Sequence, residues 1–209
     1  MKIARVSLAF LLLILATNQV IAYTEVLFSP DDKPTSKLLE YIKSSKKRIY
    51  AAVYMLTDKI IAEALIDAQI NRNVDVQVVI DKITYESIFG KGKMLQDHGM
   101  TIFIYDPPKT KSYNKAFNSG PIMHHKFALF DNIVWTGSFN WTVAANRSNQ
   151  ENVIITDDQI AQTRYAQCFE RLKSLCLKKK NEYRSSKEPS ALEIFIHNWK
   201  NFIRKRGFV

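Results

Sequence analysis

The sequence predicts an α/β fold, because short runs of β-forming residues alternate with segments of helical periodicity. At 209 residues the chain is long enough to bury one substantial core. It is 46% hydrophobic with only 6 Gly and 6 Pro, which excludes a low-complexity or disordered chain. Its 2 Cys exclude a disulfide scaffold. We therefore expect one main domain built as an α/β sandwich.

Strands are expected where β-branched and aromatic residues gather in short runs between turn-forming residues. The segment 74–80 is predicted to be a compact apolar strand. In chain order the expected strands are 25–29, 48–56, 74–80, 101–105, 125–130, 133–136 and 152–156.

Helices are expected where apolar residues recur at helical spacing between suitable end signals. Pro34 favours the start of the first helix, and Gly99 favours the end of the third. Asp58 can cap the second helix, and Asp157 or Asp158 can cap a long last one. In chain order the expected helices are 37–44, 58–71, 87–97 and a helix that runs to about 178.

The first 22 residues have the pattern of a secretory signal peptide. Two basic residues precede an apolar run from 6 to 16, and small residues permit cleavage between Ala22 and Tyr23. This run is shorter than the roughly 20 residues that span a bilayer. We expect a periplasmic or secreted protein, with an uncleaved signal that anchors the chain to a membrane as the alternative.

Basic residues are concentrated near the C-terminus. The net charge is +10, yet residues 23–177 hold 19 basic and 17 acidic residues. Residues 178–209 hold nine basic and three acidic ones. We expect 23–177 to be the functional domain and 178–209 a basic extension, with a linker at 181–189 and an amphipathic helix after Ser190. This extension suits a phosphate-binding arm, a membrane-surface helix or a dimer element.

The chemically active side chains gather around the strand pair 125–130 and 133–136. Alternation along the first strand places His124 and Lys126 on one face. A three-residue turn at 131–133 would pair Ser138 with Lys126 and Asn140 with His124. This register predicts an imidazole, an ammonium, a hydroxyl and a carboxamide on one patch. Such a group can attack and hold a phosphate.

Several neighbouring residues have simpler interpretations. His125 faces the other side of the strand, where core packing is the expected role. Trp135 and Trp141 are expected in the core rather than as a platform for bases. Asp131 can act as a turn residue or can support the site. Glu151 can orient the imidazole of His124 through its second nitrogen.

These residues resemble the HxKxxxxD signature of the phospholipase D superfamily and the blocks that follow it. The matching residues are His124, Lys126, Asp131, Gly137, Ser138, Asn140 and Glu151. Five residues separate Asp131 from Gly137, one fewer than is usual in the family. The resemblance covers about residues 25–177. It is strongest to the branch with a single motif, which includes bacterial EDTA-resistant endonucleases and mitochondrial cardiolipin hydrolases.

The resemblance implies a phospholipase D-type sandwich, a mostly β mixed sheet with helices on both faces. It implies a homodimer, because a single motif supplies only half of a two-histidine site. One His124 would attack phosphorus to form a phosphohistidine, and the second would act as general acid and base. Lys126 and Asn140 would bind the phosphate. Independently of the resemblance, the position of Lys115 just before the motif suits the rim of a substrate groove. The resemblance implies no metal ion or other cofactor.

The expected site residues are His124, Lys126, Asp131, Ser138, Asn140 and Glu151, with Lys115 in substrate binding. The first functional hypothesis is an endonuclease that cleaves DNA or RNA. The alternative is a phospholipase D or cardiolipin hydrolase that acts on anionic phospholipid. A third hypothesis, from a different class, is a non-catalytic protein that binds nucleic acid or membrane. A groove lined by lysines would favour nucleic acid, whereas an apolar rim would favour lipid.

Overall fold

The structure, a computed structural model, describes residues 21–106 and 121–187, with side chains described as far as Lys178 in the last helix. Most of the expected signal peptide, Lys115 and the expected helix after Ser190 lie outside the described residues. Within the described part of the chain, no helix is both long enough and apolar enough to cross a membrane.

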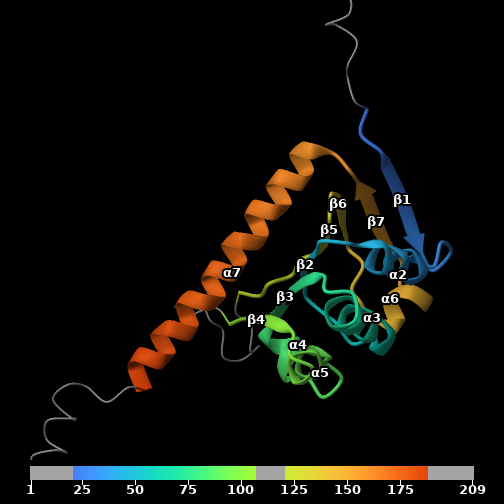
Figure 1. Cartoon of the computed structure of the whole chain (residues 1–209). Helices are drawn as coiled ribbons and strands as arrows, with labels where there is room; N and C mark the ends of the chain where they lie inside the picture. Colours follow the sequence, from blue (N-terminus) through green and yellow to red (C-terminus); the bar gives the residue numbers. More distant parts are fainter. Residues whose placement is uncertain (1–20, 107–120, 188–209) are drawn as a thin grey trace, which may run out of the picture.

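Seven strands of the described residues form one mixed sheet in the order β1-β7-β6-β5-β2-β3-β4 (Figure 1). Strands β2, β3 and β4 are parallel, and every other neighbouring pair is antiparallel. The strands are β1 (Thr24–Ser29), β2 (Arg48–Val53), β3 (Asp75–Asp81), β4 (Thr101–Tyr105), β5 (Lys126–Phe130), β6 (Ile133–Gly137) and β7 (Glu151–Thr156). The predicted mixed sheet is confirmed.

Helices cover both faces of this sheet. Buried side chains of α2, α3, α5 and α6 belong to one core cluster, and those of α7 belong to a second cluster on the opposite face. The helices are α2 (Pro34–Ser44), α3 (Lys59–Ile70), α4 (Lys82–Glu86), α5 (Gly92–Asp97), α6 (Val143–Arg147) and α7 (Gln159–Lys187). Figure 1 shows α7 running diagonally across its face of the sheet.

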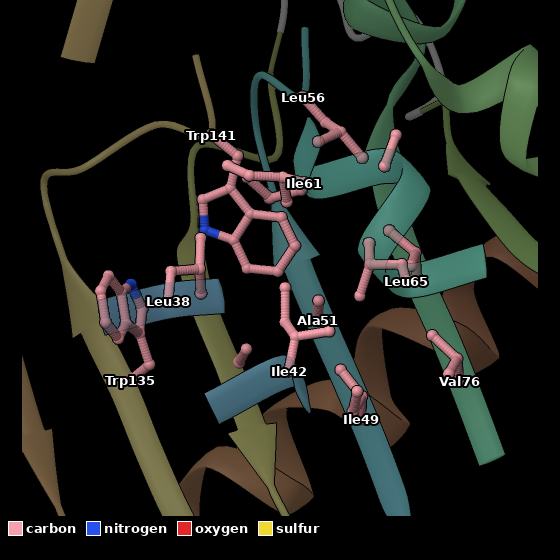
Figure 2. Close-up of a cluster of buried hydrophobic side chains, with 14 of the residues drawn as sticks. Leu38, Ile42, Ile49, Ala51, Leu56, Ile61, Leu65, Val76, Trp135 and Trp141 are labelled. Carbon is pink, nitrogen blue, oxygen red and sulfur yellow. The ribbon is translucent and has the colours of Figure 1, made fainter. Parts of the chain in front are cut away.

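Strand alternation explains the two cores. In β2, Ile49, Ala51 and Val53 belong to the cluster beneath α2 and α3, whereas Ala52 belongs to the cluster beneath α7. The central strands thus bury side chains on both faces, which is why most of their residues are apolar. Trp135 and Trp141 are fully buried in the larger cluster, as predicted (Figure 2).

Capping explains where two helices begin. Oδ1 of Asp58 accepts a hydrogen bond of 2.9 Å from the Ile60 N–H and caps α3, as predicted. Oδ1 of Asp158 accepts one of 2.7 Å from the Ala161 N–H at the start of α7. The choice between Asp157 and Asp158 as the α7 cap is thereby settled in favour of Asp158.

The structure corrects three predicted elements. Of the helix expected at 87–97, only α5 forms; residues 87–91 make a turn in which Gly90 packs against the Thr84 backbone, and the preceding α4 was not predicted. The short α6 was not predicted; Thr142 caps it by accepting a hydrogen bond from the Ala145 N–H. Helix α7 continues to Lys187, through the expected boundary at 178 and most of the expected linker.

Candidate active site

The candidate site lies at the edge of the sheet where β2 and β3 end and β5 begins. Because β5 is antiparallel to β2, its first residue Lys126 lies opposite Val53, the last residue of β2. Asp81 ends the neighbouring strand β3. The chain before β5 therefore passes over two strand ends, and His124 lies on this segment.

His124 presents an exposed imidazole that rests on one aromatic ring. Its ring centroid lies 4.6 Å from that of Tyr54, at an interplanar angle of 56°. Partial burial lowers the pKa of His124, and the positive charge of Lys126 lowers it further. The negative charge of Asp81 opposes both effects. The balance favours the neutral imidazole, which is the form that can attack phosphorus.

Lys126 lies directly beside this imidazole, although its side chain is almost fully buried, at 6% exposed. Its Nζ donates a 2.9 Å hydrogen bond to the carbonyl oxygen of His124 and lies 5.0 Å from the ring centre of Tyr54. Burial lowers the pKa of Lys126, and the Glu151 carboxylate opposes that effect. A cation held in such a dry position interacts strongly with an anionic substrate.

Asp81 and Tyr54 hold the His124 segment in place. Oδ2 of Asp81 accepts a 2.8 Å hydrogen bond from the Met123 N–H, and its Oδ1 accepts one of 2.9 Å from the Ile83 N–H. The Tyr54 N–H donates to the His125 carbonyl over 2.7 Å. The chain is thus fixed on both sides of His124.

Sequence reasoning missed both Asp81 and Tyr54. One signal was available for Asp81, since a lone carboxylate directly follows the apolar run 74–80. Polar residues at the carboxyl ends of parallel strands commonly face a site. Nothing in the sequence distinguished Tyr54 from an ordinary strand residue.

Gly137 permits the close packing of β6 on β7 at the edge of the site. Its φ is +152°, and a Cβ there would lie 2.1 Å from the carbonyl oxygen of Asn152. Beyond it, the Ser138 N–H donates to the Asn152 carbonyl over 3.0 Å. Oγ of Ser138 accepts a hydrogen bond from the Asn152 N–H, also over 3.0 Å. Ser138 therefore fastens its loop to β7.

The same loop is fastened to the chain that follows β2. The Trp141 N–H donates to the Met55 carbonyl, and the Trp141 carbonyl accepts from the N–H groups of Thr57 and Asp58. Asn140 is thereby held next to the segment that also carries Tyr54. Its Oδ1 is buried without a hydrogen-bond partner among the described residues. One side-chain atom each of Thr35, Gln77, Trp135 and Trp141 shares this property, so it does not single out Asn140.

The predicted register between β5 and β6 is wrong by one residue. Phe130 pairs with Ile133 and Ala128 with Trp135, so the turn contains two residues rather than three. Asp131 adopts a left-handed φ of 51°, which tightens this turn. The two-residue turn therefore accounts for the short spacing between Asp131 and Gly137. Ser138 and Asn140 lie in the loop after β6, which is held by hydrogen bonds to β7 and to the chain after β2 rather than by strand pairing with β5.

Glu151 begins β7 at the same edge of the sheet. Its carboxylate raises the pKa of Lys126 and accepts a 3.0 Å hydrogen bond from Nδ2 of Asn149. Among the described residues, the hydrogen bonds of Glu151 include none to His124. The structure thus brings Glu151 into electrostatic range of Lys126, whereas its predicted role in orienting the imidazole stays a prediction.

Asp131 lies apart from these residues, and its contacts favour the turn role, the first of its two predicted roles. It lies at the opposite end of β5, and seven residues of extended chain place it roughly 20 Å from His124. Its carboxylate accepts hydrogen bonds of 2.8–2.9 Å from the N–H groups of Lys46, Lys47 and Arg48. Burial would raise the pKa of Asp131, but these three donors outweigh it and hold that pKa low. Asp131 is a structural turn residue.

His125 faces α7, as the predicted alternation requires. Its ring packs against Phe127 at 5.6 Å, and Nε2 lies 4.0 Å from Sγ of Cys168. The side chain stays exposed, so the expectation of full core packing is corrected. The two cysteines are free, with Cys176 buried and Cys168 half-buried. Within the described ranges, no cluster of three or more His, Cys, Asp or Glu could hold a metal ion.

The mixed sheet and the His124–Lys126 motif are those expected of a phospholipase D-like domain. Comparison with known families gives the same result. Residues 38–173 match the family described as "Cardiolipin synthase, PLD-like domain". The chain therefore belongs to the family of phospholipase D-like domains.

Curated relatives place the similarity in the same region. The chain is 33% identical over 141 residues to a phospholipase D of Rickettsia typhi, covering 67% of this chain and 63% of that protein. It is 32% identical over 142 residues to the mitochondrial cardiolipin hydrolase of Xenopus laevis, covering 68% and 61%. The chain thus spans somewhat less than two thirds of the length of these relatives.

Two solved structures share the fold over almost their whole length. NucT from Helicobacter pylori aligns with a TM-score of 0.66 at 22% identity, covering 73% of this chain and 96% of that one. Nuc from Salmonella typhimurium, a phospholipase D family member, aligns with a TM-score of 0.62 at 26% identity, covering 74% and 96%. The predicted phospholipase D-type sandwich is confirmed.

Proposed function

We propose that this chain is a phosphodiesterase in which His124 is the nucleophile and Lys126 binds the phosphate. The observation that carries this proposal is the pairing of an exposed imidazole with an almost fully buried ammonium. Both side chains contact the same ring, that of Tyr54. Because the pKa of His124 is lowered, a neutral imidazole is available near pH 7.

The first chemical step forms a bond between an imidazole nitrogen of His124 and phosphorus. The bond from phosphorus to the leaving oxygen breaks, and that oxygen takes a proton from a general acid. Lys126 neutralises the charge on the phosphate oxygens as the transition state forms. In this proposal the amide of Asn140 donates a second hydrogen bond to those oxygens. The product is a phosphohistidine on His124.

The general acid is assigned to His124 of the partner subunit in a homodimer. In the second step this imidazole takes a proton from water, the water oxygen attacks phosphorus, and the bond to His124 breaks. The net reaction is hydrolysis, and both imidazoles return to their starting forms. The proposal of a shared site has a direct test, because hybrid dimers with one His124→Ala subunit would be inactive.

Subunit mixing therefore measures the dimer proposal. If wild-type and His124→Ala chains exchange freely, activity should follow the square of the wild-type fraction. A linear dependence would mean that each chain carries a complete site. Sedimentation of each sample establishes the oligomeric state. Recovery of hybrid dimers through a tag on one of the two chains shows that the subunits have exchanged.

Two classes of substrate fit this chemistry. A nucleic-acid strand is the first, since the sequence resembles the endonuclease branch and the fold matches Nuc over nearly that whole chain. A phospholipid is the second, since the relatives named above are a phospholipase D and a cardiolipin hydrolase. A phospholipid substrate is also favoured by exposed apolar side chains on the segments that follow β2 and β3 or precede β5, namely Met55, Ile83 and Ile122.

The testing experiment uses the purified protein in excess EDTA with three substrates: single-stranded DNA, cardiolipin vesicles and a small soluble phosphodiester. Turnover that survives EDTA and is lost in His124→Ala supports the proposal, and the preferred substrate identifies the class. Equal turnover by the variant would contradict the role of His124. The exposed Ile70→Ala variant is the matched control, because Ile70 ends α3 and takes no part in the proposed chemistry.

A further inference from the structure

The turn between α4 and α5 exposes two large apolar side chains beside the candidate site. Ile88 is 89% exposed and Phe89 is 68% exposed, whereas a soluble surface usually leaves only scattered apolar residues uncovered. In Figure 1, α4 and α5 lie at one corner of the molecule, with α5 at the lower edge of the folded body. The turn that carries the two side chains therefore lies at this corner of the fold.

The backbone of this turn is tightly specified. The Gly90 N–H donates to the Ser87 carbonyl over 3.0 Å, and the Phe89 N–H donates to Oγ of Ser87. A Cβ on Gly90 would lie 1.9 Å from the Thr84 carbonyl oxygen, so only glycine fits there. The turn therefore holds Ile88 and Phe89 in a fixed place.

The turn is connected by hydrogen bonds to the residues that hold His124. The Ile83 and Met123 N–H groups bind the same carboxylate, that of Asp81. The Lys91 N–H donates to the Leu56 carbonyl over 2.9 Å, two residues beyond Tyr54. Both ends of the segment that carries Ile88 and Phe89 are therefore bonded to the residues that position His124.

Other exposed apolar side chains lie on the segments that carry or adjoin the candidate site. They follow the ends of β2 and β3 or precede β5, and they are Met55, Ile83 and Ile122. Together with Ile88 and Phe89 they form what we call the apolar rim. Lys91 and Lys93 follow the turn directly, and Lys93 is exposed. Exposed apolar side chains followed directly in the chain by lysines match the interface of an anionic bilayer.

We infer that the apolar rim docks the site end of this protein on an anionic phospholipid bilayer, with Ile88 and Phe89 inserted among the acyl chains. The inference rests on the proposed phosphodiesterase function and favours its phospholipid substrate class. Insertion of the turn brings headgroup phosphates to the level of His124 and Lys126. A single nucleic-acid strand could stack a base on Phe89, but it offers no partner for the aliphatic side chains of Ile83, Ile88 and Ile122.

Insertion is measured directly by a reporter tryptophan in the full-length protein. Phe89→Trp is compared with Ile160→Trp, which replaces an exposed isoleucine near the start of α7, at the opposite end of the sheet. Vesicles contain cardiolipin and phosphatidylcholine with brominated acyl chains. We expect strong quenching of Phe89→Trp and weak quenching of Ile160→Trp, both relative to the parent protein. Equal quenching of the two would overturn the inference.

A second measurement links docking to turnover. Ile88→Ser/Phe89→Ser should lower kcat/KM on cardiolipin vesicles by about tenfold or more, because burial of each large apolar side chain changes an equilibrium constant by one to two powers of ten. The turnover of a small soluble phosphodiester by this variant should stay unchanged. The control variant Ile70→Ser/Ile160→Ser should keep its turnover on both substrates. An unchanged kcat/KM on vesicles would contradict docking through this turn.

The outcomes separate this inference from the proposed function. If the parent protein hydrolyses no phosphodiester while Phe89→Trp is quenched, the proposed function fails and docking stands. If Ile88→Ser/Phe89→Ser instead converts a dimer to a monomer and Phe89→Trp is not quenched, the apolar rim is a contact between two copies of the chain. That result would also overturn the inference.

Discussion

The Met123 N–H donates a 2.8 Å hydrogen bond to Oδ2 of Asp81, and this bond fixes the chain directly before His124. Asp81 is almost fully buried at the end of β3. Its position explains how a nucleophile outside any helix or strand can keep a defined orientation, since the neighbouring residue is held by a charged acceptor.

Replacing Asp81 with Asn tests this positioning role. The variant loses a charge that raises the pKa of His124, so that pKa should fall further. The acid limb of kcat/KM should therefore move to lower pH, because the imidazole stays neutral to lower pH. We also expect kcat to fall by about tenfold or more, as small displacements of reacting groups commonly cost that much. Asp75→Asn, at the other end of β3, is the matched control.

If the acid limb of kcat/KM does not move in Asp81→Asn and only the stability of the fold changes, Asp81 has a purely structural role. A pH profile of kcat/KM distinguishes the two roles, since a loss of folded protein lowers the whole curve without shifting it.

Lys126→Met tests the electrostatic role of the buried ammonium. We expect kcat to fall on the order of 10²–10³-fold, the effect of removing one preorganised donor to a developing anion. Thermal stability should change little, because Met fills a similar volume and avoids the desolvation that lowers the pKa of Lys126. Steady-state kinetics and calorimetry check both results, with the exposed Lys59→Met as control. A kcat close to that of the wild type would show that Lys126 does not act on substrate.

Asp131→Ala separates turn formation from catalysis. The variant leaves three backbone donors without their carboxylate, which we expect to cost about 1–3 kcal/mol of unfolding free energy at pH 7. The pKa of Asp131 is lower in the folded protein than in the unfolded chain. The stabilisation is therefore fully present at a pH above the pKa of the unfolded chain, and it is lost as the pH falls through the pKa of the folded protein. Urea unfolding at pH 7 and in acid measures the difference. Loss of kcat in the fully folded variant would restore Asp131 to the catalytic group.

Gly137→Ala tests the close approach of β6 to β7. An added Cβ meets the Asn152 carbonyl at 2.1 Å, so the loop carrying Ser138 and Asn140 must move. We expect a loss of about 1–3 kcal/mol in stability from backbone strain, together with a loss of activity. At Gly99, where φ is +77° but no atom lies within 4 Å, the same substitution should cost stability alone. Equal activity losses at both glycines would contradict this explanation.

Local sequence signals were sufficient for most of the fold. Apolar runs with β-branched residues marked the central strands, and Asp58 marked the start of α3 through its capping oxygen. The helix predicted at 87–97 was only partly right because residues 87–91 form a turn in which Gly90 packs against Thr84, a contact between separate segments. Periodicity within a window cannot report such a contact.

Those parts of the candidate site that depend on residue type were predicted from the sequence. Those that depend on how β5 pairs with β6 were not. His124 and Lys126 were identified from their spacing, and the structure places them side by side. The strand register was wrong because Asp131 adopts a left-handed conformation that shortens the turn by one residue. Asp81 and Tyr54 were missed because their contacts with the His124 segment join residues far apart in the sequence.

The central claim is that His124 carries the covalent intermediate, and trapping that intermediate tests it most directly. The enzyme is mixed with a labelled phosphodiester, quenched within the first turnover under denaturing alkaline conditions, and digested for mass spectrometry. The account predicts a phosphoester adduct on the peptide containing His124, absent in His124→Ala. Turnover with an adduct on another residue, or undiminished turnover by His124→Ala, would contradict it.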